Sequence, residues 1–468
     1  MRAESPPILA GSAILLRLYR LRALAAWMVH KPVDAIRRRG RLPRLVPGEL
    51  IVVTRTADAR TIAAALIAEL ENERRFYRIT KPTPLGGQPP RKERTLHELA
   101  AWRLNVRHGA ERAMLLELEL RMASALAVHG GYTGIDWRLA REAARAQMSA
   151  QRSRFLHPSG NGLTPSGPVD LTPVHELYRQ MLCHGAAAGD GTHVVVLDTS
   201  IDLSTLPAME DAPPVTVGDP PSGYGPTKVY GHGAAMVSII RSVAPSASIT
   251  LRPVLGFTDD ETSEAALLST LIELTYSERR VDVVVLCGNM GPGSIYWSPR
   301  DTRRRGDIER ILRTVRFGAV VVTSTGNAGV FDANDDVLFP ATCEPVVAVG
   351  AIDRRMSRPA YSKYRFSAVP PSLFVTAPGG RPATNDEPAE AAVTVGGHDE
   401  VGTSIAAAYA AGVVARVVSE LRQQEPATSE QIIAHLATTA DRSFANYAAH
   451  PEHYGSGMII HRVAAAAG

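Results

Sequence analysis

Unbroken apolar runs alternate with amphipathic stretches along the chain from residue 193 onward. Runs of Val, Ile and Leu without polar alternation predict strands that are buried on both faces, and helical spacers between such strands predict a parallel sheet. The strand-like runs are 193–197, 248–255, 281–286, 319–324 and 345–352, and the spacers are 232–241, 264–276 and 307–316. We therefore expect an α/β domain, a parallel sheet with helices on both faces, with its ligand site beyond the carboxyl ends of the strands.

The first part of the chain has a different pattern. Residues 49–56 and 76–80 predict strands, with an amphipathic helix between them, and residues 96–151 predict mostly helix. This arrangement is typical of a smaller α+β domain. At 468 residues the chain is long enough for one large domain and a smaller one.

Glycine, proline, serine and asparagine crowd together between Leu156 and Pro173, a composition typical of an exposed linker. A domain boundary is expected there. The predicted organisation is an N-terminal α+β domain over residues 1–155, a linker and lead-in segment over 156–190, and the large α/β domain over 191–468.

Composition excludes several classes of protein. Hydrophobic residues make up 45% and charged residues 21% of the chain, which is the balance of a globular protein. Its three cysteines predict no disulfide framework. The apolar run at residues 8–16 is followed by arginines, which fits a basic amphipathic helix better than a signal peptide, and no run is long enough for a membrane span. We expect a cytoplasmic location, with secretion as the alternative.

The net charge of +4 hides an asymmetry between the two parts of the chain. Residues 1–190 hold 29 Lys and Arg against 17 Asp and Glu, whereas residues 191–468 hold 22 against 30. Two interpretations fit a basic first part. It could bind nucleic acid, but its arginines are scattered and no nucleic-acid motif accompanies them. Intramolecular docking of the basic part on the acidic part is the favoured interpretation.

Four polar residues stand where the predicted sheet would place a site. Asp198 follows the first strand of the large domain, His232 lies at the start of a helix, Asn327 follows the strand at 319–324, and Ser404 begins another helix. Each has an ordinary explanation by itself, as a helix cap or a turn residue. Together they supply a complete set of roles for acyl transfer.

Acyl transfer from a serine needs a particular set of partners. A serine hydroxyl becomes a good nucleophile when an imidazole takes its proton, and a buried carboxylate fixes the tautomer of that imidazole. Ser404, His232 and Asp198 can fill these three roles. The amide of Asn327, with the backbone N–H of Ser404, can stabilise the negative oxygen of the tetrahedral intermediate.

With these residues the chain resembles the subtilase family, in which the catalytic residues occur in the order Asp, His, Ser. The resemblance extends from about His193 to the C-terminus and includes the APGG turn at residues 377–380. It implies a serine endopeptidase that acts on protein or peptide substrates through an acyl-enzyme on Ser404. It also implies that two segments line the substrate site by strand addition, Leu286, Cys287 and Gly288 on one side and the segment 323–326, with Ser324, Thr325 and Gly326, on the other.

In this family an N-terminal propeptide commonly occupies the cleft until it is cleaved, and residues 1–190 could be such a prodomain. Their length leaves room for a sensor or partner-binding role, including control of the protease by nucleic acid. A catalytically silent binding scaffold is the alternative for the large domain, because the sequence departs from the family pattern at Ser200, Ala234, Cys287, Ala408 and Tyr409. The catalytic atoms are nevertheless all present, so an active enzyme is favoured.

Two acidic clusters are candidates for a metal site, one at residues 259–261 and one that contains Asp332, Asn334, Asp335 and Asp336. Neither has the spacing of a calcium-binding loop, so solvated loops are favoured and no metal ligand is assigned. The chemistry requires no cofactor. Structural calcium is an expectation from the family resemblance alone.

Overall fold

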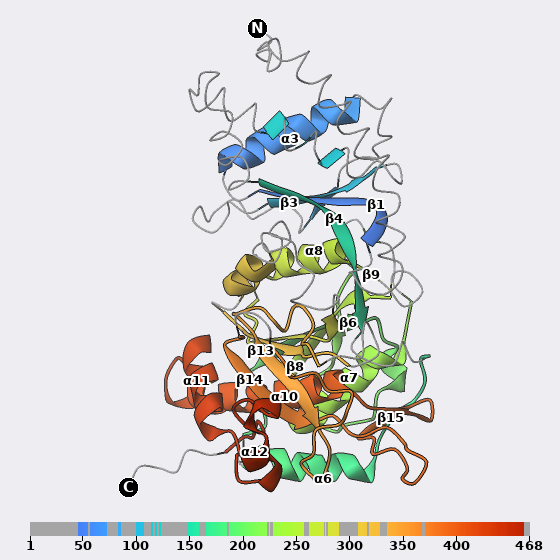
Figure 1. Cartoon of the computed structure of the whole chain (residues 1–468), viewed down its shortest axis with the longest axis vertical. Coiled ribbons are helices and arrows are strands. Elements are labelled where there is room, and N and C mark those ends of the chain that lie inside the picture. The colour runs from blue at the N-terminus through green and yellow to red at the C-terminus, as the bar shows by residue number, and fades with distance from the viewer. Residues whose placement is uncertain are drawn as a thin grey trace. The chain divides into compact units, whose positions relative to one another are not determined.

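The computed structural model of the chain describes residues 45–54, 57–72, 83–85, 100–106, 114–115, 118, 121–122, 148–158 and 165–462, the last range with gaps at 185–186, 222–223, 225–227, 257–261, 276, 278, 290–307, 316–317, 328–334 and 367–369. The chain divides into two compact units (Figure 1). The first comprises residues 1–154 and 263–269, and the second comprises residues 155–262 and 270–468.

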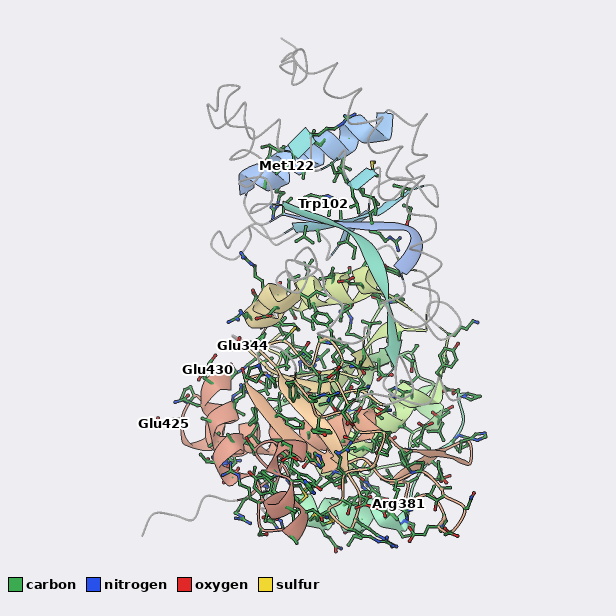
Figure 2. The ribbon with its side chains drawn as sticks, in the orientation of Figure 1. Trp102, Met122, Glu344, Arg381, Glu425 and Glu430 are labelled. Atoms are coloured by element: carbon green, nitrogen blue, oxygen red, sulfur yellow. The ribbon has the colours of Figure 1, made fainter. Side chains whose placement is uncertain are left out.

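The first unit is built on an antiparallel sheet and one long helix. Its strands, in the order β4-β1-β3-β2, are β4 (Met148–Pro158), β1 (Leu45–Thr54), β3 (Ala100–Asn105) and β2 (Thr83–Leu85). Helix α3 (Ala57–Asn72) follows β1 and contributes Leu66 to a core that also contains Leu50 and Leu104. Met122 belongs to the same core and Trp102 packs against it (Figure 2).

The strands β3 and β4 correct the helix prediction at residues 100–105 and 148–151, whereas residues 114–115, 118 and 121–122 are helical as predicted. The segment is rich in Ala, Arg and Leu, which favour helices in isolation. Pairing with β1 on both sides overrides this preference, because it satisfies the backbone of β3 and β4 and buries Leu104. The strand predicted at residues 76–80 lies outside the described residues.

The second unit contains the predicted parallel sheet, which has seven strands in the order β14-β13-β12-β10-β6-β8-β7. All of its neighbouring pairs are parallel. The bounds are β6 (His193–Thr199), β7 (Thr216–Val217), β8 (Ser248–Leu255), β10 (Val283–Leu286), β12 (Val320–Ser324), β13 (Val347–Ile352) and β14 (Leu373–Pro378). Every residue of β6, β10, β12 and β13 is buried, as the unbroken apolar runs predict.

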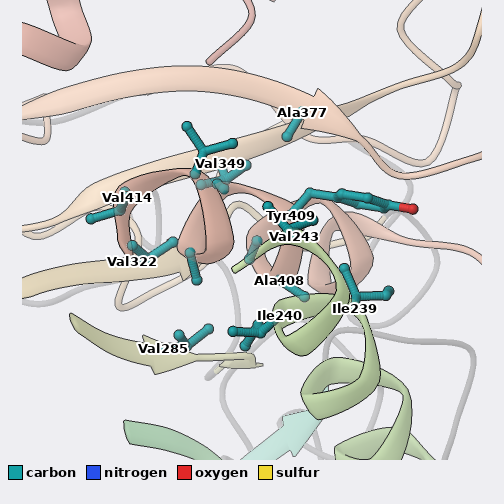
Figure 3. Close-up of a cluster of buried hydrophobic side chains, with 14 of the residues drawn as sticks. Ile239, Ile240, Val243, Val285, Val322, Val349, Ala377, Ala408, Tyr409 and Val414 are labelled. Carbon is teal, nitrogen blue, oxygen red and sulfur yellow. The ribbon is translucent and has the colours of Figure 1, made fainter. Parts of the chain in front are cut away.

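Two helices, α7 (Gly231–Val243) and α10 (Thr403–Gln424), pack together against one face of this sheet. Gly412 of α10 lies so close to Val243 that a Cβ atom there would come within 2.6 Å of the valine side chain. Figure 3 shows Ile239 and Ile240 of α7 beside Ala408 of α10. The helical residues 308–315 connect β10 to β12 and cover the opposite face, as right-handed crossovers require. Helices on both faces are therefore confirmed.

The described part of the segment predicted as an exposed linker contains secondary structure. Strand β5 (Val169–Leu171) pairs with β15 (Val393–Val395), which also pairs with β16 (His398–Glu400). Helix α6 (Pro173–Leu182) follows β5 and buries Tyr178 and Leu182 in the main core. The glycines and prolines predicted a loop but did not reveal β5 or the start of α6, because short strands and proline-initiated helices use the same residues.

The remaining elements are η2 (Leu203–Thr205), β9 (Thr262–Ser263), α8 (Glu264–Thr275), β11 (Gly288–Asn289), α11 (Ser429–Thr439), α12 (Ala445–Ala449) and η3 (Pro451–His453). Within the described residues, α10 has the length and apolarity of a membrane-spanning helix over Thr403–Gln423, yet 89% of its most apolar window is buried inside the protein. It is the central core helix of the second unit. The three cysteines are all free, so no disulfide is present, as predicted.

Candidate active site

The carboxyl end of β6 and the beginning of α7 bring Asp198 and His232 together. Asp198 is the penultimate residue of β6, and His232 is the second residue of α7. Gly233 permits this approach, because a Cβ atom there would lie 2.6 Å from the carbonyl oxygen of Thr199. Nδ1 of His232 forms a hydrogen bond of 2.8 Å with Oδ1 of Asp198. Both side chains are buried, at 1% and 0% exposure.

This pair sets the protonation chemistry of the imidazole. Burial by itself lowers the pKa of His232, but the charge of Asp198 and its hydrogen bond, with a further contribution from the charge of Glu400, outweigh burial and raise the pKa above its ordinary value. With Nδ1–H donated to the carboxylate, the other ring nitrogen carries the lone pair. This Nε2 atom is buried and has no hydrogen-bond partner in the described part of the chain.

Asn327 and Ser404 meet at the beginning of α10. Oδ1 of Asn327 accepts hydrogen bonds from the backbone N–H of Thr403 at 3.0 Å and from its hydroxyl at 2.9 Å. These two bonds hold the oxygen end of the amide, so its NH₂ group faces away from Thr403. Ser404 is the second residue of α10, where backbone N–H groups lack partners within the helix. Ser404 and Asn327 are both buried.

Cys287 links the two halves of the site. Its Sγ atom lies 3.9 Å from the carbonyl oxygen of Ser404 and 3.9 Å from the sulfur of Met236 in α7. Burial and the charge of Asp198 raise the pKa of this thiol well above its ordinary value. The group is therefore a neutral thiol that packs beneath the serine.

The predicted substrate segments lie on neighbouring strands. Leu286 ends β10 and pairs in register with Thr323 of β12. After β10, Gly288 belongs to β11; Ser324 ends β12, and Thr325 and Gly326 lead from it to Asn327. The side chain of Asn289 donates a hydrogen bond of 3.1 Å to the carbonyl oxygen of Ser324 and so holds the two segments together.

Strand β11 is paired with the chain itself. Gly288 and Asn289 pair in antiparallel register with Pro158 and His157 at the end of β4. All four residues belong to the second unit. The edge predicted to receive an extended peptide by strand addition therefore already carries an extended segment of this chain.

The sequence did not indicate three residues that shape this site, namely Asn289, Leu338 and Thr403. Leu338 is fully buried and its side chain lies against Gly326, where a Cβ atom would come within 2.4 Å of it. Gly326 has φ +97°, a conformation that suits glycine. Of the three, Thr403 alone had a local signal, because it directly precedes the predicted nucleophile.

The departures from the family pattern have local structural partners. The hydroxyl of Tyr409 forms a 2.6 Å hydrogen bond with Nδ1 of His175 in α6, and the two rings stack. Ala408 is fully buried in the core between α10 and α7. Ala234 is buried in the first turn of α7, and Ser200 forms a backbone bridge with Val229. These positions shape packing around the site, and they remove none of its polar atoms.

The structure describes only two residues of the acidic clusters that were candidates for a metal site, Asp335 and Asp336. Residues 259–261, Asp332 and Asn334 lie outside the described residues. Asp335 and Asp336 form ion pairs with Arg358 at 3.4 Å and Arg365 at 2.9 Å. Their carboxylates are thus engaged by arginines.

Comparisons with known proteins identify the family of the second unit. The model of the Subtilase family matches residues 189–457. Subtilisin DY of Bacillus licheniformis is 27% identical over 278 residues, which are 58% of this chain and 89% of that protein. Subtilisin NAT of Bacillus subtilis subsp. natto is 29% identical over 285 residues, 59% of this chain and 66% of that protein. Fervidolysin from Fervidobacterium pennivorans, a keratinolytic enzyme related to subtilisin, has a similar fold over 89% of this chain and 60% of its own, with a TM-score of 0.52 and 16% identity.

Proposed function

This chain belongs to the subtilase family and is a serine peptidase, and from this premise we propose that it hydrolyses peptide bonds through an acyl-enzyme on Ser404. The observation that carries the proposal is the buried hydrogen bond between Asp198 and His232, which leaves Nε2 of the imidazole as a base without a partner in the described residues. At the same edge of the sheet, Ser404 is the proposed nucleophile and Asn327 is the proposed amide donor.

In the first half of the reaction, Oγ of Ser404 attacks the carbonyl carbon of the scissile bond and its proton passes to Nε2 of His232. Asp198 stabilises the imidazolium that forms. The NH₂ group of Asn327 and the backbone N–H of Ser404 donate to the developing oxyanion. The intermediate then collapses, the C–N bond breaks, and the leaving amine takes the proton from His232.

In the second half, a water molecule attacks the acyl-enzyme and gives one proton to His232. The ester bond to Ser404 breaks, and the serine oxygen recovers that proton. The raised pKa of His232 makes it a stronger base toward the serine hydroxyl, at the cost of being protonated over a wider range of acidic pH.

A fluorophosphonate probe tests this function, because the probe reacts covalently with an activated serine. We expect labelling of the wild-type chain and none of Ser404→Ala, together with cleavage of a casein or peptide-library substrate by the wild type alone. Equal labelling of both proteins would refute the assignment of Ser404. No labelling of either would favour the alternative of a silent binding scaffold.

We propose further that the N-terminal part of the chain inhibits the peptidase until it is cleaved or displaced. The support is the antiparallel pairing of His157 and Pro158 with Gly288 and Asn289, which occupies the edge where an extended substrate would add a strand. Charge supports the same proposal, since residues 1–190 are strongly basic and the remainder is acidic. Proteolysis would require this segment to leave the edge.

The experiment is to express the wild type beside Ser404→Ala and to determine any new N-terminus by mass spectrometry. We expect the wild type to be cut within a few residues after Pro158, and Ser404→Ala to remain intact. If the wild type and Ser404→Ala both stay intact while only the wild type reacts with the fluorophosphonate, self-processing is excluded. The assignment of Ser404 as the catalytic serine would still hold.

We also propose that Leu338 restricts the pocket for the residue that precedes the scissile bond. Gly326 belongs to one proposed wall of this pocket and adjoins Asn327, and the buried side chain of Leu338 lies directly against it. A side chain that filled this space would leave room only for small residues. Ser159 and Gly160, which follow the paired segment, are residues of this kind.

A further inference from the structure

A compact cluster of metal-binding side chains lies at the end of the described chain, away from the residues assigned to catalysis. His450, Glu452 and His453 each present one ligand atom, and these three atoms all lie within 4.8 Å of one another. Oε1 of Glu452 lies 3.4 Å from Nδ1 of His450 and 3.7 Å from Nε2 of His453. We propose that these three side chains form a binding site for a zinc ion.

The spacing of the ligand atoms fits a tetrahedral metal. Zinc binds imidazole nitrogen and carboxylate oxygen at about 2.0–2.2 Å, so two ligands of a tetrahedral ion lie roughly 3.3–3.6 Å apart. Two of the three separations, 3.4 and 3.7 Å, already have nearly this value, and the third is at most 4.8 Å. Two nitrogens and one carboxylate leave a fourth position for water.

The backbone holds the ligands in place. His450 follows α12 and donates its N–H to the carbonyl oxygen of Asn446, and η3 begins at Pro451. The N–H of His453 donates to the carbonyl oxygen of His450 at 3.0 Å. In a 3₁₀ turn the side chains three residues apart eclipse each other, which explains why the two imidazoles stack with centroids 4.9 Å apart.

The donor atoms of the ligands suit a transition metal. The ring of His453 packs edge-on against Tyr364, with the centroids 4.3 Å apart. Two imidazoles with one carboxylate favour zinc over calcium, which prefers a shell of six to eight oxygens.

The position of the site gives the ion a structural role. The same C-terminal segment is attached to the loop at residues 353–366, since the side chain of Asn446 donates to the carbonyl oxygen of Met356 at 3.0 Å. Further along this loop, the N–H of Lys363 donates to the carbonyl oxygen of Gly326, next to Asn327. A zinc ion on η3 would therefore stabilise the loop that supports the oxyanion amide.

The test uses the full-length chain with Ser404→Ala, which prevents self-digestion, after removal of metal with EDTA. Zinc binding is measured by competition with a chromophoric zinc indicator, and Tm is measured with and without zinc chloride. In this background we compare His450→Ala and Glu452→Gln with the control His184→Ala. The side chains of His450 and Glu452 are 60% and 59% exposed, so neither change should prevent folding.

We expect the parent and His184→Ala each to bind one equivalent of zinc. His450→Ala and Glu452→Gln should bind zinc at least about 10-fold more weakly or not at all. Zinc should raise Tm in the parent and the control, and should leave Tm of the site variants unchanged. Calcium chloride should not reproduce the effect. Zinc binding by His450→Ala and Glu452→Gln that equals the parent in stoichiometry and affinity would overturn the proposal, as would a parent protein that binds no zinc.

Discussion

Thr403 offers the sharpest test of how the oxyanion amide is positioned. Its hydroxyl donates to Oδ1 of Asn327 at 2.9 Å and accepts from the N–H of Gly326 at 3.2 Å. Thr403→Val replaces the hydroxyl by a methyl group of similar size and removes both bonds without opening a cavity. Asn327 then keeps the hydrogen bond from the backbone N–H of Thr403 at 3.0 Å.

The size of the effect follows from what is lost. A neutral hydrogen bond contributes about 1 kcal/mol, and 1.36 kcal/mol corresponds to a tenfold change in rate, so we expect kcat to fall about 5- to 10-fold. Complete loss of the amide would cost about 10²–10³-fold, a range borrowed from subtilisin, itself a member of this family. The buried N–H of Gly326 also loses its acceptor, at a cost to stability of about 1–3 kcal/mol.

The assay measures kcat and KM on a chromogenic peptide, with Tm as a check of folding. Thr403→Ser is the matched control, because it keeps the hydroxyl. We expect Thr403→Val to lower kcat with little change in KM, and Thr403→Ser to stay close to wild type. Wild-type kcat in Thr403→Val, or an equal loss in Thr403→Ser, would refute the argument that this hydroxyl positions the amide.

Three further predictions follow from the site and its support. The proposed reaction needs the neutral imidazole of His232, so activity should rise with pH through the raised pKa of that group. Glu400→Gln removes one negative charge that raises this pKa, so it should move the acidic limb of the kcat/KM profile to lower pH. Asp399→Asn changes an exposed neighbour and should move the limb less. Leu338→Ala should increase the cleavage of peptides that have a large residue before the scissile bond, relative to peptides that have a small one. It should also lower the free energy of unfolding by roughly 2–5 kcal/mol. An unchanged preference in a peptide library would count against the restricted pocket. Tyr409→Phe leaves His175 without its partner and should cost about 1 kcal/mol in a urea titration, with kcat unchanged; an unaltered midpoint would show that the bond contributes nothing.

The parallel sheet could be predicted from sequence because its strands are buried on both faces. Such strands need apolar residues at every position, and few other structures produce runs like the one in β6. The positions of Asp198, His232, Asn327 and Ser404 followed from the same pattern, since each stands at the end of a strand or the beginning of a helix on one edge of the sheet. In the first unit, β1 and α3 lie where a strand and an amphipathic helix were predicted, whereas β3 and β4 gave no such signal because they depend on pairing with β1.

Residues that act by positioning another residue could not be predicted from the sequence. Leu338 and Asn289 matter because of the segment each contacts, and those contacts exist only after distant parts of the chain have come together. The pairing of β4 with β11 belongs to the same class, since it joins residues about 130 positions apart and no local pattern at His157 or Gly288 indicates it.

The packing of two helices determines the distance between the proposed base and nucleophile. His232 and Ser404 are each the second residue of a helix, and α7 and α10 contact each other directly. Alanine and glycine on α10 set this contact, with Gly412 against Val243, and the guanidinium of Arg416 donates to the carbonyl oxygen of Val243 at 2.8 Å. Since buried helices in a close-packed core cannot shift independently, the small side chains that follow the nucleophile hold it in position with respect to the imidazole. The long apolar helix would therefore help to position the proposed nucleophile, although only its first turn carries that residue.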